Sequence, residues 1–461
     1  MALLGCRPGA EVPGTARRGI ESCRYDVRVT STRPLLLDVT VQCRGPAVLG
    51  LALGEADQLP FVEVPSAEGR PLQRRGQAFE LPSPRANPIF RYRVDLESAA
   101  SARKSFDFAV RHGDSVLSPA STFLLAPLPL ELDVPVEVRV ETPPGFGFET
   151  GLERRGDVYH LEAHEIPVAT YSVFGRHTAI RLPMDGDRQI DVVVLDGPRR
   201  LGDAELVKWI DRRARVVSSF YGRLPAERVV VFLLPIPDRR GVVFGKLLPE
   251  SAPGIVLLLG EQSDEEDLER DWILIHELFH VGVPSFYKEG KWFDEGLATY
   301  FEPILRVRAG ISTEVELWTD FARQMPKGVP ALTHHGLERS ADYAGVYWGG
   351  AVFCLTADIE LRLRSGLTRG LEDGVRAVFD AGGVAWDVWS LEQTLTIADQ
   401  HLGGSVLTEL AERYARRPAP FDLDELLAGL GVLRRANAVV LDDRAPFAAV
   451  RRAIVRPPPQ P

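Results

Sequence analysis

Two histidines and a glutamate within five residues are the first side chains whose types and spacing indicate chemistry. His276, Glu277 and His280 form the string His-Glu-x-x-His inside a largely apolar segment. On a helix, positions i and i+4 share a face, so both imidazoles can point at one metal ion with the glutamate beside them. The pattern predicts a zinc site in which His276 and His280 are ligands and Glu277 is the general base for a water.

A zinc site that keeps one position open for water or substrate needs a third protein ligand. We expect Glu295 to supply it, within residues 292–302, which read WFDEGLATYFE. Asp294, Thr299 and Glu302 lie close enough to Glu295 in sequence to hydrogen-bond and orient the histidines. Of these three, Glu302 is ranked first.

This second motif resembles that of the gluzincins, zinc metallopeptidases in which a helix opening with Glu-Gly supplies the third ligand. The chain is similar to the glycyl aminopeptidase family and, more distantly, to the aminopeptidase N family, from residue 24 onward. The resemblance implies one bound Zn²⁺ per chain and a peptide or protein substrate. Fourteen residues separate His280 from Glu295, fewer than in either family.

A further match lies in residues 343–351, which read YAGVYWGGA. They are similar to the Tyr-x-Lys-Gly-Ala helix start of these families, with Gly349 in place of the lysine. This register makes Tyr347 the counterpart of the catalytic tyrosine, whose phenol donates a hydrogen bond to an oxyanion. Tyr343, one turn earlier on the same face, is the alternative, and we otherwise assign it to substrate binding.

The families' substrate-recognition strings, Gly-x-Met-Glu-Asn and Gly-Gly-x-Glu-His, are absent. Residues 240–251 correspond to them, and Glu250 takes the place of the glutamate that grips a substrate amino terminus, unless it is an exposed loop carboxylate. A peptide can still add as a strand along this edge. Aminopeptidase and endopeptidase activity are both expectations. The alternatives are an inactive peptide-binding protein of the same fold and a hydrolase of a non-peptide substrate.

Hydrophobic periodicity predicts the elements that position these residues. Residues 24–183 alternate in short runs and predict an antiparallel β-sandwich-like domain. Residues 184–300 mix strands and helices, which the resemblance makes a thermolysin-like zinc domain, and the acidic residues 264–267 are expected to begin the zinc helix. The predicted class is α+β and multidomain. The remaining divisions are a helical lobe at 301–440, with helices at 315–325, 342–364, 371–380, 389–401, 404–415 and 422–430, a leader at 1–23 and a tail at 441–461.

Charge and the first residues bear on partners and location. A formal net charge of −10 argues against a nucleic-acid partner. Leu3-Leu4-Gly5-Cys6 resembles the end of a bacterial lipobox, which predicts an exported envelope lipoprotein whose membrane contact is a lipid on Cys6. If that match is due to chance, the expectation is a cytoplasmic protein. Oligomeric state does not follow from the sequence.

Two cysteines flank a predicted hairpin. With a turn at Arg33, Cys23 pairs with Cys43, and the odd positions of both strands lie on the apolar face. Directly opposed residues are close enough for a disulfide. The alternatives are therefore a disulfide between Cys23 and Cys43, or two buried thiols.

Overall fold

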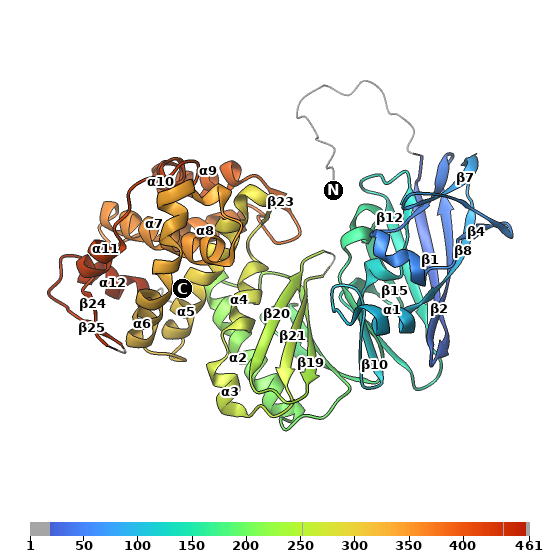
Figure 1. Cartoon of the computed structure of the whole chain (residues 1–461), viewed down its shortest axis with the longest axis horizontal. Coiled ribbons are helices and arrows are strands. Elements are labelled where there is room, and N and C mark those ends of the chain that lie inside the picture. The colour runs from blue at the N-terminus through green and yellow to red at the C-terminus, as the bar shows by residue number, and fades with distance from the viewer. Residues whose placement is uncertain (1–18, 251, 437, 458–461) are drawn as a thin grey trace, which may run out of the picture. The chain divides into compact units, whose positions relative to one another are not determined.

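The computed structural model describes residues 19–250, 252–436 and 438–457, which form two compact units (Figure 1). Within the described part of the chain, the first unit comprises residues 19–111, 116–148 and 152–169, and the second comprises 112–115, 149–151 and the residues from 170 onward. The architecture is mixed α and β with several sheets, so the chain is multidomain as predicted. Among the described helices, none combines the length and apolarity needed to cross a membrane. The lipobox hypothesis on Cys6 falls outside the described residues.

The first unit is built mainly from sheets. An eight-stranded sheet has the order β14-β15-β12-β1-β2-β8-β4-β5, and a four-stranded sheet has the order β11-β3-β7-β6. The bounds in chain order are β1 (Ser22–Thr32), β2 (Leu35–Arg44), β3 (Val48–Ala52), β4 (Ser66–Ala67), β5 (Arg70–Pro71), β6 (Gln73–Arg75), β7 (Ala78–Arg85), β8 (Ile89–Asp95), α1 (Leu96–Arg103), β11 (Ala126–Leu128), β12 (Pro135–Glu141), β14 (Glu153–Arg155) and β15 (Val158–Glu162). The chain also forms β9 (Val110–His112), β10 (Ser115–Pro119) and β13 (Gly147–Thr150), and β16 (Tyr171–Gly175) belongs to the second unit.

The hairpin of β1 and β2 has the predicted register. Cys23 faces Cys43, and the odd-numbered positions of both strands are buried from Cys23 to Val29 and from Leu35 to Cys43. The two cysteines form a disulfide, so the thiol alternative is wrong. Strand β1 begins at Ser22, inside the predicted leader. It also pairs with β12 in parallel, so the sheet is not wholly antiparallel, because a long intervening segment carries the chain back to the same end.

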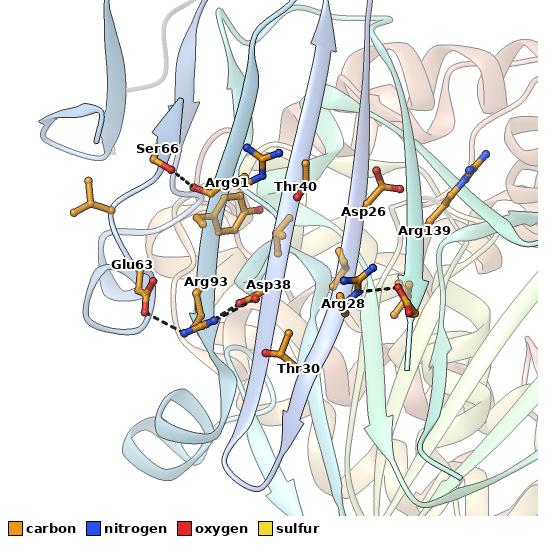
Figure 2. Close-up of a pocket in the computed structure, with 16 residues that line it drawn as sticks. Asp26, Arg28, Thr30, Asp38, Thr40, Glu63, Ser66, Arg91, Arg93 and Arg139 are labelled. Carbon is orange, nitrogen blue, oxygen red and sulfur yellow. Dashed lines mark hydrogen bonds and ion pairs between the residues drawn. The ribbon is translucent and has the colours of Figure 1, made fainter. Parts of the chain in front are cut away.

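The outer face of the eight-stranded sheet carries a hollow of about 690 Å³ (Figure 2). Charged side chains of β1, β2, β8 and β12 line it, and they alternate in sign across neighbouring strands. Arg28 of β1, for example, lies opposite Glu141 on one side and Asp38 on the other. Figure 2 shows the ion pair of Arg93 with Asp38. Arg28 also forms an ion pair with Glu141, at 2.8 Å.

A five-stranded sheet organises the first part of the second unit, with the order β17-β18-β19-β21-β20. Its strands are β17 (His177–Pro183), β18 (Gln189–Leu195), β19 (Arg228–Ile236), β20 (Val242–Leu248) and β21 (Gly254–Gly260). The central strands β18, β19 and β21 are parallel, and their continuous apolar runs are buried, as in sheets covered on both faces. Strand β20 pairs antiparallel with β21 and leaves its other edge at the margin of the sheet.

Helices make up most of the rest of the second unit (Figure 1). They are α2 (Asp203–Tyr221), α3 (Glu265–Arg270), α4 (Ile273–His280), α5 (Lys291–Arg308), α6 (Glu314–Gln324), α7 (Gly350–Arg364), α8 (Leu371–Asp380), α9 (Leu391–Leu402), α10 (Val406–Tyr414), α11 (Leu423–Gly429) and α12 (Ala448–Val455). Short strand pairs join β22 (Ser285–Phe286) to β23 (Val388–Trp389) and β24 (Val432–Arg434) to β25 (Val439–Leu441). The predicted helices between 315 and 430 are confirmed within a few residues, and the one at 342–364 opens with a π-helical turn, Ala344–Gly349.

Residues 441–457 do not form the predicted tail. Helix α12 lies there, and its apolar residues Val450 and Ile454 are buried in the same hydrophobic core as the sheet and the other helices. Arg451, also buried, forms an ion pair with Glu314 at 2.6 Å. Positions four apart on one helix face supply an apolar stripe that must be covered, and the core covers this one. The divisions at 183/184 and 300/301 stay predictions.

Candidate active site

Helix α4, which carries His276, Glu277 and His280, begins later than the acidic residues suggested. Asp264 caps a separate short helix, α3, by accepting a hydrogen bond from the N–H of Asp267. The backbone then becomes extended at Asp271, whose carboxylate accepts hydrogen bonds from the N–H groups of Ile273 and Leu274 at 3.0 and 3.3 Å. The prediction that residues 264–267 begin the zinc helix is therefore wrong, because Asp271 interrupts the helix and provides a second N-terminal cap.

The three predicted ligands converge. His276 and His280 of α4 and Glu295 of α5 each offer a ligand atom, and these atoms all lie within 4.8 Å of one another. Oε2 of Glu295 is 3.4 Å from Nε2 of either histidine, and the two Nε2 atoms are 3.2 Å apart. The fourteen-residue connection is thus long enough to keep α4 and α5 adjacent. Two imidazoles and one carboxylate around a common point are a donor set that suits zinc with one position left open.

Asp294 fixes the orientation of one of these imidazoles. Its Oδ1 lies 2.6 Å from Nδ1 of His280. A carboxylate there holds the proton on Nδ1, which leaves the lone pair of Nε2 directed at the metal position. Because the tautomer required of a ligand is already imposed by a neighbour, the cluster fits a metal better than it fits a chance meeting of polar groups.

The other two predicted orienting residues have different surroundings. Glu302 is buried and lies 3.6 Å from Arg306, and burial raises the pKa of its carboxyl to about 8. The hydroxyl of Thr299 and Nδ1 of His276 are buried without a hydrogen-bond partner among the described residues. The structure therefore brings Asp294 to a ligand and pairs Glu302, the residue ranked first, with an arginine.

Glu277 lies between the cluster and the edge strand β20. Its carboxylate accepts a hydrogen bond from the N–H of Leu247, and burial raises the pKa of the carboxyl above its ordinary value against the opposing effect of the two imidazoles. Gly245 makes this approach possible, because a Cβ atom there would lie 2.4 Å from Ile273 and 2.9 Å from Cγ of Glu277. A half-buried carboxylate with a raised pKa is suited to taking and returning a proton near neutral pH.

Two glycines bring Tyr347 to the cluster. A Cβ atom on Gly296 would lie 2.5 Å from the backbone of Gly350, so α5 and α7 meet backbone to backbone immediately after Glu295. This crossing sets the ring of Tyr347 parallel to that of His276, with centroids 6.0 Å apart. Burial and the neighbouring Glu295 carboxylate, which accepts a hydrogen bond from the phenol, raise the pKa of Tyr347, so the hydroxyl remains a donor.

The two residues assigned to substrate binding differ in placement. Tyr343 is exposed and stacks on Tyr347 with ring centroids 4.3 Å apart, so it lies beside the cluster. Glu250 follows the end of β20 and is half-buried. The ring contact with Tyr347 therefore places Tyr343 against the residues of the cluster, and the role assigned to Glu250 stays a prediction.

Two further residues at the cluster were not predicted. Trp272 is exposed, and its ring meets that of His276 edge to face at 5.6 Å. Lys291 is the first residue of α5 and places its ammonium 2.9 Å from Oε1 of Glu295. Their sequence spacing held a signal, because each stands four positions before a ligand and therefore on the same helical face.

Comparisons with known proteins show where this fold occurs. No protein-family model matches the sequence, and no curated protein matches it. Among solved structures, the chain is similar to an aminopeptidase N family protein from Idiomarina loihiensis, at 16% identity and TM-score 0.68, over 89% of this chain and 78% of that one. It is also similar to a mutant of a two-domain M1 zinc metallopeptidase bound to L-arginine, at 17% identity and TM-score 0.54, over 89% and 97%. A Deinococcus radiodurans M1 zinc metallopeptidase mutant bound to a Tyr-Ser-Ala substrate matches at 17% identity and TM-score 0.53, over 88% and 96%.

These likenesses place the chain among proteins with the fold of M1 zinc metallopeptidases. The resemblance to the aminopeptidase N family is distant in sequence and extends over most of the chain. The nearer resemblance expected to the glycyl aminopeptidases stays a prediction.

Proposed function

We propose that this chain is a zinc-dependent metallopeptidase. The observation that carries the proposal is the convergence of His276, His280 and Glu295, with a half-buried base, Glu277, on the helix of the two histidines. Bound zinc would polarise a scissile carbonyl and lower the pKa of a water towards neutrality. Burial would raise the pKa of Glu295, but hydrogen bonds from the two histidines and the charge of Lys291 hold it low, so the carboxylate stays ionised as a ligand must.

Two side chains of the protein would move or hold the protons of the reaction. Glu277, anchored by the N–H of Leu247, would take a proton from the attacking water and pass it to the leaving amine. Tyr347 would donate its hydroxyl hydrogen to the oxyanion that forms on the former carbonyl oxygen. Because the Tyr347 hydroxyl already bonds to Glu295, it lies within reach of the same reaction centre.

Strand β20, at the margin of its sheet and beside Glu277, would hold the substrate as an added strand. Pairing of this kind uses the substrate backbone, so it does not depend on the substrate's side chains. Two of the similar structures contain L-arginine and a tripeptide substrate, which supports a peptide as the substrate class here. The side chains of β20 also affect which peptides are cleaved.

Endopeptidase cleavage is a second candidate beside aminopeptidase activity. One observation favours it: the residues of β20, Val242–Leu248, include no acidic side chain that would hold a substrate amino terminus next to the cluster.

Zinc content and peptide cleavage by the full chain test the proposal. We expect about one zinc per chain, and we expect Glu277→Gln to keep the metal while losing roughly 10²- to 10⁴-fold in kcat. Glu289→Gln, which changes an exposed glutamate between the ligand helices, serves as the matched control. A wild-type protein without zinc, or equal cleavage by Glu277→Gln, would refute the proposal. Cleavage of amino-blocked peptides would establish endopeptidase activity, and cleavage of free-amino peptides alone would establish aminopeptidase activity.

A further inference from the structure

The two carboxylate oxygens of Glu295 have different neighbours, and Lys291 contacts one of them. Oε2 of Glu295 faces the histidines, 3.4 Å from each Nε2, whereas Oε1 lies 2.9 Å from Nζ of Lys291. The same ammonium is 3.6 Å from Oδ2 of Asp294, whose other oxygen holds His280. One cation therefore touches both the carboxylate ligand and the carboxylate that orients a histidine ligand.

Helix stability does not explain a lysine at this position. Lys291 is the first residue of α5, where the helix dipole favours acidic side chains and disfavours a cation. Lysine placed four residues before glutamate is also the weaker orientation of such a pair. An ordinary exposed pair of this kind contributes little to helix stability. The placement is better explained by the two carboxylates that the ammonium contacts.

The two carboxylates that Lys291 contacts are buried, although the lysine itself is accessible. The side chains of Glu295 and Asp294 are 8% and 16% exposed, and that of Lys291 is 56% exposed. Two adjacent carboxylates removed from water repel each other unless a positive charge or a hydrogen-bond donor compensates them. Lys291 supplies a positive charge to both carboxylates and lies within hydrogen-bond distance of Glu295.

We propose that Lys291 is a positioning residue of the metal centre, which holds Oε1 of Glu295 so that the carboxylate presents one oxygen to the metal. The inference rests on the zinc site of the proposed function and adds a residue to it. A cation beside a metal ion also repels it. We expect the charge-assisted hydrogen bond to the buried carboxylate, at 2.9 Å, to outweigh that repulsion.

Zinc affinity of the full-length apoprotein, measured by competition with a chromophoric chelator, tests this role. Lys291→Met keeps the length of the side chain and removes the charge and the donor, and we expect zinc binding to weaken about 10- to 100-fold. Lys291→Arg restores a cationic donor and should recover most of that loss. Lys288→Met is the matched control. Lys288 is exposed like Lys291 and lies three residues earlier, outside the cluster, so this variant should bind zinc like wild type.

Turnover at saturating zinc provides the second measurement. We expect Lys291→Met to lower kcat with little change in KM, because Glu295 is then held less firmly while the substrate edge is intact. Unchanged or tighter zinc binding by Lys291→Met would overturn the inference, as would an equal loss in Lys291→Arg and Lys291→Met. A melting temperature of apo Lys291→Met equal to that of the wild-type apoprotein would assign the lost affinity to the site and not to the fold.

The outcome for Lys291 is separable from the outcome for the proposed function. A chain that binds zinc with the predicted dependence on Lys291 but cleaves no peptide would leave the positioning role standing and refute the peptidase. A chain that cleaves peptides with Glu277 as its base, and whose zinc affinity does not change when Lys291 is substituted, would refute the positioning role alone.

Discussion

Two charged regions of the molecule, one in each unit, organise their charges in opposite ways. On the eight-stranded sheet, acidic and basic side chains alternate across the strands of an open hollow (Figure 2). The pair of Arg28 and Glu141 is typical, with side chains 66% and 69% exposed. At the cluster of α4 and α5, by contrast, His276, His280 and Glu295 are largely removed from water and point at a common position.

The difference shows that volume alone does not identify a site in this protein. The hollow of the sheet is large, yet its side chains stand parallel to one another on neighbouring strands, so each acid meets a base beside it. The ligand cluster is small, and its donors converge because two helices cross there. Convergence of buried donors, which costs free energy unless a ligand or metal compensates it, is the stronger indication of function.

Zinc removal should have the largest effect. Saturation at about a thousand times the dissociation constant stabilises a folded protein by roughly 4 kcal/mol, so chelation should lower the stability of the second unit by an amount of that order. Urea unfolding with and without chelator, followed by a probe on each unit, measures this. An equal loss in the sheet-rich first unit would contradict the assignment of the metal to the helical cluster.

Tyr347→Phe should lower kcat about 10²- to 10³-fold while zinc binding is retained, because the variant keeps the ring and loses the donor to the oxyanion. Steady-state kinetics with zinc analysis provide the measurement. Tyr343→Phe, which removes the hydroxyl of the neighbouring ring, is the matched control and should change kcat by less than about threefold. If the two variants exchange these effects, Tyr343 is the catalytic tyrosine.

Gly296→Ala should destabilise the protein by about 1–3 kcal/mol, because its Cβ would lie 2.5 Å from the backbone of Gly350 and would push α5 and α7 apart. Chemical denaturation checks the size of the loss. Gly404→Ala, at a position where an added Cβ meets nothing within 4 Å, should leave stability almost unchanged. Comparable effects of both substitutions would show that the crossing of the two helices is not tight.

Glu302 predicts how stability depends on pH. Burial raises its pKa from 4.5 to about 8, so between these values the folded state holds a proton that the unfolded state has released. Stability should therefore fall as pH rises across this window, by at most about 1.4 kcal/mol per pH unit, and should level off above pH 8. Glu302→Gln should flatten this dependence in urea titrations at pH 5.5, 6.5 and 7.5 with zinc present. Parallel curves for the two proteins would contradict a buried, protonated Glu302.

The ion pairs of the sheet hollow should have the smallest effect. A double-mutant cycle on Arg28 and Glu141 is expected to give a coupling below about 1 kcal/mol, because both side chains are exposed and screened. Neither Arg28→Ala nor Glu141→Ala should change zinc affinity or kcat. A large coupling, or an effect on catalysis, would remove the distinction between the two charged regions.

Features with a short repeat could be predicted from the sequence. The period of two in β1 and β2 set Cys23 against Cys43, and the period of 3.6 put His276 and His280 on one helix face. The third ligand, Glu295, was identified from the motif around it. In each case the residues concerned lie on one element or belong to one local motif, so the geometry of the backbone determines their relation.

Relations between elements were decided by the tertiary structure. Asp294 rather than Glu302 reaches His280, and Tyr347 meets the cluster because Gly296 and Gly350 let two helices touch. Residues 441–457 were predicted to be a tail, but the apolar face of α12 is buried in the hydrophobic core. The amino-acid sequence by itself determined which residues could bind a metal. Close packing of segments far apart in the chain decided which neighbours orient them, because side-chain contacts depend on distances that no local periodicity sets.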